Sequence, residues 1–267
     1  MTGVEVGFRH RVDSIDWYYE LRGEGPVVVL IPSGEGDCGS FEKAATILSG
    51  EFTVLTFDMP GFSRTSDPPN FVDYSLTQAA GEIAALVRSL GLSPATFYGC
   101  SSGGVVALCL TSDHSELVRE VVVHEVPLSP PGEWLSRLTM LDDDQIIRAC
   151  QDRFRNQMNE NAEAWDALGK AYHRRLERNY VTWVHHYIQQ NRYLRTFTTE
   201  ELQRRSIIWT IGGLNPVEAF FDNVVMAHTA GIPIGLLRCR HFPQVSVPEV
   251  IAAHIGKAAR EANILHK

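Results

Sequence analysis

Residues 95–108 read ATFYGCSSGGVVAL, a β-prone run that enters a Gly-x-Ser-x-Gly match and leaves it through an apolar run suited to a helix. In such a strand–turn–helix setting the match places a serine hydroxyl on a strained turn above the end of a sheet. Gly99 and Gly103 lack a Cβ, so neighbouring backbone can approach the turn closely. A chance match in a glycine-rich turn is the alternative, but it does not explain the flanking runs. The stretch therefore predicts that Ser101 is a nucleophile.

Short β-rich runs alternate with helical patterns on both sides of this turn. Such alternation is typical of α/β proteins, in which helices cover both faces of a mostly parallel sheet. Ser75 with Gln78, and Ser246 with Glu249, form capping-box patterns that predict the starts of two helices, and Gly91 predicts the end of the first. Besides the run that begins at residue 95, strands are expected at residues 4–12, 15–21, 27–31, 52–57, 121–123, 207–211 and 232–237.

The alternation stops between Pro127 and about Ser206, where no convincing strand pattern is found. The segment is rich in charged and amide residues, and its apolar residues recur at helical spacing. We expect residues 128–206 to form a helical cap inserted before the penultimate strand, over the end of the sheet that carries the serine. Residues 1–127 and 207–267 would then form the core domain. Extra surface helices without a covering role are the alternative.

Length and composition exclude several classes of protein. The 267 residues are 44% hydrophobic and 21% charged, with a net charge of −8, and such a chain can bury the core of one large domain. The negative charge argues against nucleic-acid and anionic-membrane partners, and no apolar run approaches the ~20 residues that a membrane span requires. Residues 1–6 do not resemble a signal peptide, and the five cysteines have no C-x-x-C spacing. We therefore expect a cytoplasmic protein with free thiols.

The sequence contains no pattern for a metal or an organic cofactor. Its His, Cys and acidic residues lack metal-ligand spacing, and no phosphate-binding loop or dinucleotide fingerprint is found. We expect neither a metal nor a cofactor. Asp58, which directly follows a predicted buried strand, is interpreted as a residue that stabilises a turn.

A serine hydroxyl attacks well at neutral pH only when an oriented base removes its proton. Where the serine stands on a strand–turn–helix of this kind, an acid and then a histidine follow it in the chain. His241 lies between the last predicted strand and the last predicted helix, where the base is expected. The other histidines lie too early, in the predicted cap or on predicted surfaces. We therefore predict that His241 is the base, and a surface-loop histidine is the alternative.

The position of the acid is less usual. The loop after the penultimate strand, residues 212–216, commonly carries the acid but contains no carboxylate here. Glu125 stands at the end of the strand that follows the nucleophile's helix, from which its long side chain can reach the imidazole. We favour Glu125 as the acid. Two alternatives stay open: Glu218 could be the acid, or Glu125 could form a structural ion pair with an arginine. His124 is interpreted as a packed residue at the strand end.

An acyl-transfer site also needs N–H donors for the oxyanion that develops during attack. One is expected from Ser102, the residue after the nucleophile, and the other from the loop after the third strand. Gly34 is the candidate in that loop, because a glycine lets a backbone N–H point into a crowded site. An ordinary glycine-rich turn at residues 32–36 is the alternative.

Taken together, these motifs resemble the fungal zearalenone hydrolases, lactonases of the α/β-hydrolase superfamily. The likeness extends from the second predicted strand to the last loop and includes the cap. A Gly-Cys-Ser-Ser-Gly turn combined with a His-Glu pair at a strand end is more particular than a general superfamily match. The segments that carry the resemblance are residues 17–20, 56–61, 99–103, 124–125, 179–180, 183, 220–223, 235–237 and 241–243.

The resemblance implies an α/β-hydrolase fold with a helical cap. It also implies a serine hydrolase that opens the ester bond of a macrocyclic resorcylic acid lactone, zearalenone or a related zearalenol, and so detoxifies the mycotoxin. Ser101, Glu125 and His241 would be nucleophile, acid and base. Gly34 and Ser102 would donate to the oxyanion. The partner would be the small-molecule lactone, with no cofactor, and a homodimer is implied.

Four substrate contacts are implied as well. Trp183 in the cap would hold the lactone, and Tyr187, Leu135 and Phe221 would contribute to its pocket; packing within the cap is the alternative for the first two. Residues 153–154, Arg and Phe, stand where the resemblance leads us to expect small aliphatic residues, which bears on the choice among zearalenone and the zearalenols. Three other functions stay open: a general carboxylesterase, a carbon–carbon bond hydrolase of the same fold, and a ligand receptor that keeps the triad.

Overall fold

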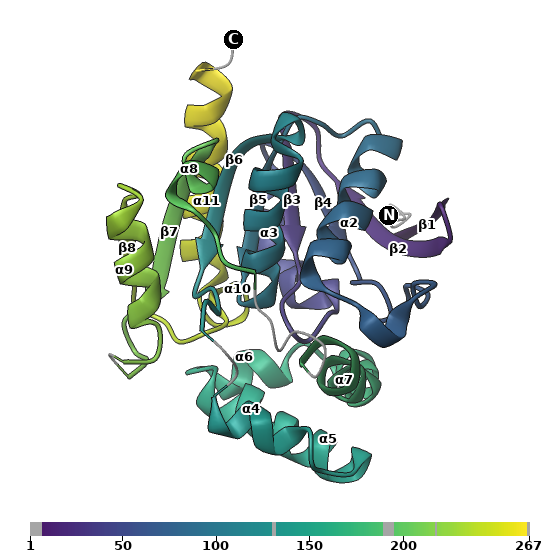
Figure 1. Ribbon diagram of the computed structural model, residues 1–267. Helices are drawn as coiled ribbons and strands as arrows, with labels where there is room; N and C mark the ends of the chain where they lie inside the picture. Colours follow the sequence, from purple (N-terminus) through teal and green to yellow (C-terminus); the bar gives the residue numbers. More distant parts are fainter. Residues whose placement is uncertain (1–6, 130–131, 189–194, 217, 266–267) are drawn as a thin grey trace.

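The computed structural model describes residues 7–129, 132–188, 195–216 and 218–265, and its strands form one sheet (Figure 1). The strands are β1 (Gly7–Val12), β2 (Ile15–Arg22), β3 (Val27–Ile31), β4 (Thr53–Phe57), β5 (Ala95–Cys100), β6 (Val118–His124), β7 (Ser206–Gly212) and β8 (Ile234–Leu237). Their order across the sheet is β1-β2-β4-β3-β5-β6-β7-β8. Strands β3 to β8 pair in parallel, whereas β2 pairs antiparallel with β1 and β4. The mostly parallel sheet predicted from the sequence is confirmed.

The strand predictions differ from the structure mainly at their ends. β3 has the predicted bounds, and its near-continuous burial explains why its sequence is apolar without alternation. β6 begins three residues before the predicted Val121. β8 begins at Ile234 rather than Ile232, because Pro233 lacks the N–H that a paired strand residue donates. Of the first predicted strand, residues 4–6 lie outside the described residues.

Helices cover both faces of the sheet (Figure 1). The helices α2 (Leu76–Ser89) and α3 (Ser102–Asp113) contribute their buried side chains to the apolar cluster on one face, together with Ala227 of α9 (Phe221–Thr229). On the other face, α1 (Glu42–Leu48) and α11 (Pro248–Leu265) contribute theirs. The layered α/β arrangement therefore removes both faces of the central strands from water.

One of the two predicted capping boxes is present and the other is not. The hydroxyl of Ser75 accepts from the N–H of Gln78 and the Gln78 side chain accepts in return, so α2 begins as predicted. Ser246 instead ends the short helix α10 (Pro243–Ser246), where its hydroxyl donates to the carbonyl of Phe242. The prediction for Ser246 was wrong because a separate helical turn begins at Pro243, so that α11 starts only at Pro248.

The described residues between β6 and β7 contain helices and no strand. Their helices are α4 (Glu133–Leu138), α5 (Asp143–Asp152), α6 (Ala162–Asp166), α7 (Lys170–Thr182) and α8 (Thr199–Leu202), with single π-helical segments η4 (Arg153–Gln157) and η5 (Trp183–Ile188). Figure 1 shows α4 to α7 gathered at one end of the sheet, and we call residues 132–188 the cap. Helix α8 lies at the opposite end, where Leu202 joins the core beside α3 (Figure 1). In the described parts of the chain, no helix is both long and apolar enough to cross a membrane.

Candidate active site

Ser101 stands on the predicted turn between a strand and a helix. β5 ends at Cys100 and α3 begins at Ser102, so Ser101 occupies the junction with a φ of 56° and a ψ of −127°. A non-glycine residue with positive φ costs on the order of 1–3 kcal/mol and is characteristic of functional turns. The N–H of Ser101 donates to the carbonyl oxygen of His124 at 2.9 Å, which ties the turn to the neighbouring strand β6.

The two glycines of the turn are required by close backbone contacts. A Cβ on Gly99 would lie 2.1 Å from the carbonyl oxygen of Gly103, on the opposite side of the turn. A Cβ on Gly103 would lie 2.6 Å from the carbonyl oxygen of Ile31, at the end of β3. The sequence prediction that these glycines permit close backbone approach is confirmed.

His241 lies after β8, on the loop that precedes α10, and is 3% exposed. Its Nδ1 is 2.7 Å from Oε2 of Glu125, and its backbone N–H donates to the carbonyl oxygen of Met158 at 3.0 Å. The ring of Phe220 stacks on the imidazole, with centroids 5.2 Å apart and planes 9° apart. The imidazole is therefore held at Nδ1 by Glu125 and on one ring face by Phe220.

Glu125 directly follows β6 and has a φ of 48°, which turns its side chain from the strand end toward His241. Its Oε1 accepts hydrogen bonds from the N–H of Gly212 at 2.7 Å and from the side-chain amide of Asn215 at 2.6 Å. Burial opposes its charge, but the hydrogen bonds from His241 and Gly212 outweigh it and hold the pKa of Glu125 below its usual value. Glu125 is thus a buried, ionised carboxylate.

The other carboxylates near the end of β7 do not contact the imidazole. Glu218 is exposed before α9. Asp222 accepts instead from the hydroxyl of Ser129 at 2.7 Å and from the amide of Asn223. Among the described residues, the carboxylate of Glu125 contacts His241, Gly212 and Asn215, with the His124 imidazole 3.9 Å away, and it forms no ion pair with an arginine. The geometry therefore favours Glu125 over both alternatives.

His124 is packed at the strand end and Asp58 stabilises a turn, as their positions in the sequence indicated. His124 is fully buried, and burial lowers its pKa to about 4, so its imidazole is neutral at pH 7. Its Nδ1 lies 3.0 Å from the hydroxyl of Thr210. The carboxylate of Asp58 accepts from the backbone N–H of Cys38 and from both the backbone and the guanidinium of Arg64. Asp58 therefore stabilises a turn away from the imidazole.

The two predicted oxyanion donors come from neighbouring strand ends. Ser102 is the first residue of α3, and the first N–H groups of a helix have no partner within the helix. Gly34 lies in the loop after β3, and a Cβ there would be 2.7 Å from Cε2 and Nε1 of the Trp183 indole. The cap tryptophan thus lies directly on the Gly34 backbone, in a space that only glycine leaves open.

A cavity of about 1000 Å³ lies between this end of the core and the cap. Ser101, Ser102 and His241 line it from the core, while Trp183, Leu135 and Tyr187 line it from the cap, as predicted. The hydroxyl of Tyr187 donates to the carbonyl oxygen of Pro60, so this residue offers its ring to the cavity rather than a free hydroxyl.

Phe221 is placed differently from the prediction. Its side chain is 58% exposed at the start of α9 and does not line the cavity, whereas the preceding Phe220 lines it and stacks on His241. Successive residues at a helix start point in different directions, and sequence alone did not settle which of the two rings faces inward.

Asn215 was not predicted as a site residue, although the lack of a carboxylate in its loop was itself a signal that some other residue of this loop serves the site.

Helix α7 is fastened to the core by buried polar contacts. The guanidinium of Arg175 donates to both carboxylate oxygens of the fully buried Asp37, at 2.5 and 3.0 Å. The amide of Asn179 donates to the carbonyl oxygen of Glu35 at 2.7 Å and accepts from the N–H of Ser63 at 2.9 Å. Because Trp183 follows α7 directly, these contacts place its indole over Gly34.

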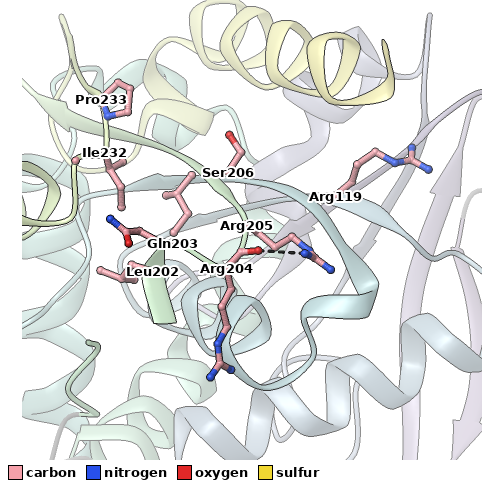
Figure 2. A pocket seen from close by; sticks show the side chains of 10 residues that line it. Arg119, Leu202, Gln203, Arg204, Arg205, Ser206, Ile232 and Pro233 are labelled. Carbon is pink, nitrogen blue, oxygen red and sulfur yellow. Dashed lines mark hydrogen bonds between the residues drawn. The ribbon is translucent and has the colours of Figure 1, made fainter. Parts of the chain in front are cut away.

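A second cavity, of about 400 Å³, lies at the opposite end of β6 and β7 (Figure 2). Three arginines line it, but Figure 2 shows that their guanidinium groups point apart rather than toward one place. Arg204 donates to the carbonyl oxygen of Ser112, and Arg205 donates to those of Ser115 and Val118. These two arginines therefore bind the backbone, and we assign the chemistry to the larger cavity.

Comparison with known proteins agrees with this geometry. The sequence profile of the alpha/beta hydrolase fold family matches residues 26–209, and the chain belongs to that family. It is 42% identical over 252 residues to a zearalenone hydrolase of Cladophialophora bantiana, covering 93% of this chain and 94% of the relative. It is 35% identical over 255 residues to a zearalenone hydrolase of Bionectria ochroleuca, covering 93% and 96%.

Solved structures support the fold independently. The enol-lactonase of Burkholderia xenovorans LB400 superposes with a TM-score of 0.76 over 94% of this chain and 99% of its own, at 17% sequence identity. A thermophilic esterase from Thermogutta terrifontis superposes with a TM-score of 0.74, over 96% of this chain and 98% of its own, at 18% identity. At these identities the likeness shows a shared fold.

Proposed function

We propose that this protein hydrolyses the ester bond of a macrocyclic resorcylic acid lactone, zearalenone or a zearalenol, through an acyl-enzyme on Ser101. The observation that carries the proposal is the Glu125–His241 pair at 2.7 Å, whose imidazole shares one cavity with the serine on the strained turn. The substrate class is supported by the two zearalenone hydrolases to which the chain is similar over almost its full length.

In the proposed reaction, Nε2 of His241 takes the proton of the Ser101 hydroxyl as its oxygen attacks the lactone carbonyl carbon. Glu125 accepts the Nδ1–H and stabilises the imidazolium that forms. The N–H groups of Ser102 and Gly34 donate to the oxyanion of the tetrahedral intermediate. His241 then gives its proton to the ring oxygen as the carbon–oxygen bond breaks. The alcohol stays attached to the acyl group, since both belonged to one ring.

Deacylation repeats these steps with water as the nucleophile. His241 removes a proton from a water molecule, whose oxygen attacks the acyl carbon, and then returns the proton to Ser101 as the serine ester breaks. The product is a hydroxy acid that contains one water more than the lactone. No cofactor is needed for this balance of atoms and protons, because only the water is consumed.

The cavity supports a bulky ligand over a short ester. Its volume of about 1000 Å³ lies at the upper end of the range of about 300–1,000 Å³ that is common for small-molecule sites. Trp134, Leu135 and Trp183 give the cap side an apolar and aromatic surface, which suits a ligand with an aromatic ring and an aliphatic macrocycle. These contacts support Trp183 and Leu135 as substrate-binding residues.

The experiment that tests the substrate class compares zearalenone with short-chain aryl esters, with kcat/KM as the readout. We expect the macrolactone to be the better substrate, and the Trp183→Ala variant to lose this preference while it still hydrolyses the short esters. A general carboxylesterase would show the reverse order with the wild type. A ligand receptor would stop after about one turnover and retain a covalent adduct.

The homodimer implied by the resemblance stays a prediction, which light scattering on the purified protein tests.

A further inference from the structure

The helix formed by α5 and η4 ends against the loop that carries His241. The last carbonyl groups of a helix have no partner within it and must find one elsewhere. Here the guanidinium of Arg240 donates to the carbonyl oxygens of Asn156 at 3.0 Å and Gln157 at 3.3 Å. The backbone N–H of His241 donates to the carbonyl oxygen of Met158 at 3.0 Å. The proposed base and its neighbour thus cap the end of this helix.

A fourth hydrogen bond joins the same two segments. Oε2 of Glu160, three residues beyond the last residue of η4, accepts from the backbone N–H of Arg240 at 2.8 Å. The backbone N–H groups of residues 240 and 241 therefore both donate into the cap. Cationic groups are stabilised at the carbonyl end of a helix, which adds to the hydrogen bonds of the Arg240 guanidinium.

The cap segment that holds this loop also faces the cavity. Arg153, Gln157 and Met158 line the cavity, so a bound ligand meets the end of the helix. Between them, the ring of Phe154 contacts Phe242, next to the proposed base, and Trp183, with centroids 5.3 and 5.4 Å away. One short segment thus contacts both the ligand space and the loop of the base.

We propose that Arg240 and Glu160 are positioning residues that fix His241 through the end of the cap helix. Arg240 also lines the cavity, but neither residue takes part in the proposed proton transfers. Both hold the backbone from which the imidazole reaches Glu125 and faces the cavity that Ser101 lines. The proposal rests on the proposed role of His241 as base. It predicts that loosening these contacts lowers kcat far more than it raises KM, because a misplacement of about 1 Å can reduce a rate by about 10²-fold.

The test uses Arg240→Met and Glu160→Ala, with Arg238→Met as a matched control on an exposed residue of the same loop. We expect Arg240→Met and Glu160→Ala to lower kcat for zearalenone about tenfold or more, with KM changed less than about twofold, as loss of orientation predicts. Glu160→Gln keeps an oxygen acceptor for the Arg240 N–H and should restore most of kcat. The downfield proton resonance of the His241 Nδ1–H should broaden in the two impaired variants but not in Arg238→Met.

Two results would overturn the proposal. In the first, kcat stays within about twofold of wild type in both Arg240→Met and Glu160→Ala while their thermal stability falls. In the second, KM rises with kcat unchanged, which indicates that the residues contribute to uniform binding rather than to orientation. If Arg240→Met does not fold, the comparison of Glu160→Ala with Glu160→Gln alone tests the proposal. A wild-type protein that does not hydrolyse the lactone would refute the proposed function instead, and the Nδ1–H resonance would still report whether the two residues fix the imidazole.

Discussion

Glu125 and His241 lie 2.7 Å apart although 116 residues separate them in the chain. Glu125 follows β6 and His241 follows β8, so the carboxylate reaches past the end of β7, which lies between those strands. The β7 loop lacks a carboxylate but donates twice, from the N–H of Gly212 and the amide of Asn215, to the other oxygen of Glu125. The loop that commonly supplies the acid here orients the proposed acid, Glu125, which follows the neighbouring strand β6.

Replacement of Glu125 by glutamine removes the charge that stabilises a protonated His241 and keeps the shape of the side chain. We expect kcat to fall by about 10³- to 10⁴-fold, as it does when the acid of a catalytic triad loses its charge. The matched control is Glu218→Gln, which changes an exposed carboxylate and should retain the wild-type rate. A large loss in Glu218→Gln with a small one in Glu125→Gln would make Glu218 the acid.

The stability of the protein should depend on pH through the same carboxylate. The pKa of Glu125 is lowered in the folded state, since the hydrogen bonds to its charged form outweigh burial. Such a group contributes stability that is complete above its unfolded-state pKa and is lost as the pH falls through its folded-state pKa. We expect the gap in Tm between wild type and Glu125→Gln to narrow below about pH 5. A gap that stays constant down to acid pH would contradict this sign.

Gly34 and Trp183 should be energetically coupled, because a Cβ at residue 34 would lie 2.7 Å from the indole. We expect Gly34→Ala to lower kcat/KM at least about tenfold, because the new Cβ would displace the backbone N–H of residue 34, and complete loss of one oxyanion donor costs about 10²- to 10³-fold. In a Trp183→Phe background, the smaller ring leaves more room and the same substitution should cost less. A double-mutant cycle on kcat/KM measures this coupling, and strictly additive losses would show that the two residues act independently.

Cys100, at the end of β5, holds the backbone of His241 from the core, and Met158 holds it from the cap. The buried thiol of Cys100 donates to the carbonyl oxygen of His241 at 2.9 Å, and burial raises its pKa, which keeps the thiol protonated. We expect Cys100→Ala to lower kcat about threefold to tenfold, because a net hydrogen bond contributes about 0.5–1.5 kcal/mol. Cys100→Ser retains a donor and should be less impaired. If the serine variant is as slow as the alanine variant, packing rather than this hydrogen bond sets the position of His241.

Features that depend on local pattern were predictable from the sequence. The turn at Ser101, the capping box of α2 and the strand β3 each follow from residues that are adjacent in the chain. The position of His241 after the last strand followed from the order of the elements, and Glu125 followed from a missing carboxylate in another loop. These inferences needed only the period of the apolar residues and the identity of a few polar ones.

Features that depend on contacts between distant segments were not predictable. Asn215 serves Glu125 only because β7 lies beside β6, and Phe220 rather than Phe221 faces inward because of how α9 begins. The contacts of Arg240 with the end of the cap helix depend on the seating of the cap. Each of these depends on packing in three dimensions, about which a single sequence carries little information.

The proposed reaction begins with attack of the Ser101 hydroxyl on the lactone carbonyl. Chromatography of zearalenone incubated with wild type and with Ser101→Ala tests it directly, with circular dichroism to show that the variant is folded. Wild type should yield a ring-opened hydroxy acid, and Ser101→Ala should yield no more product than buffer. Product from the alanine variant at the wild-type rate would show that Ser101 is not the nucleophile, and no product from wild type would show that the lactone is not the substrate.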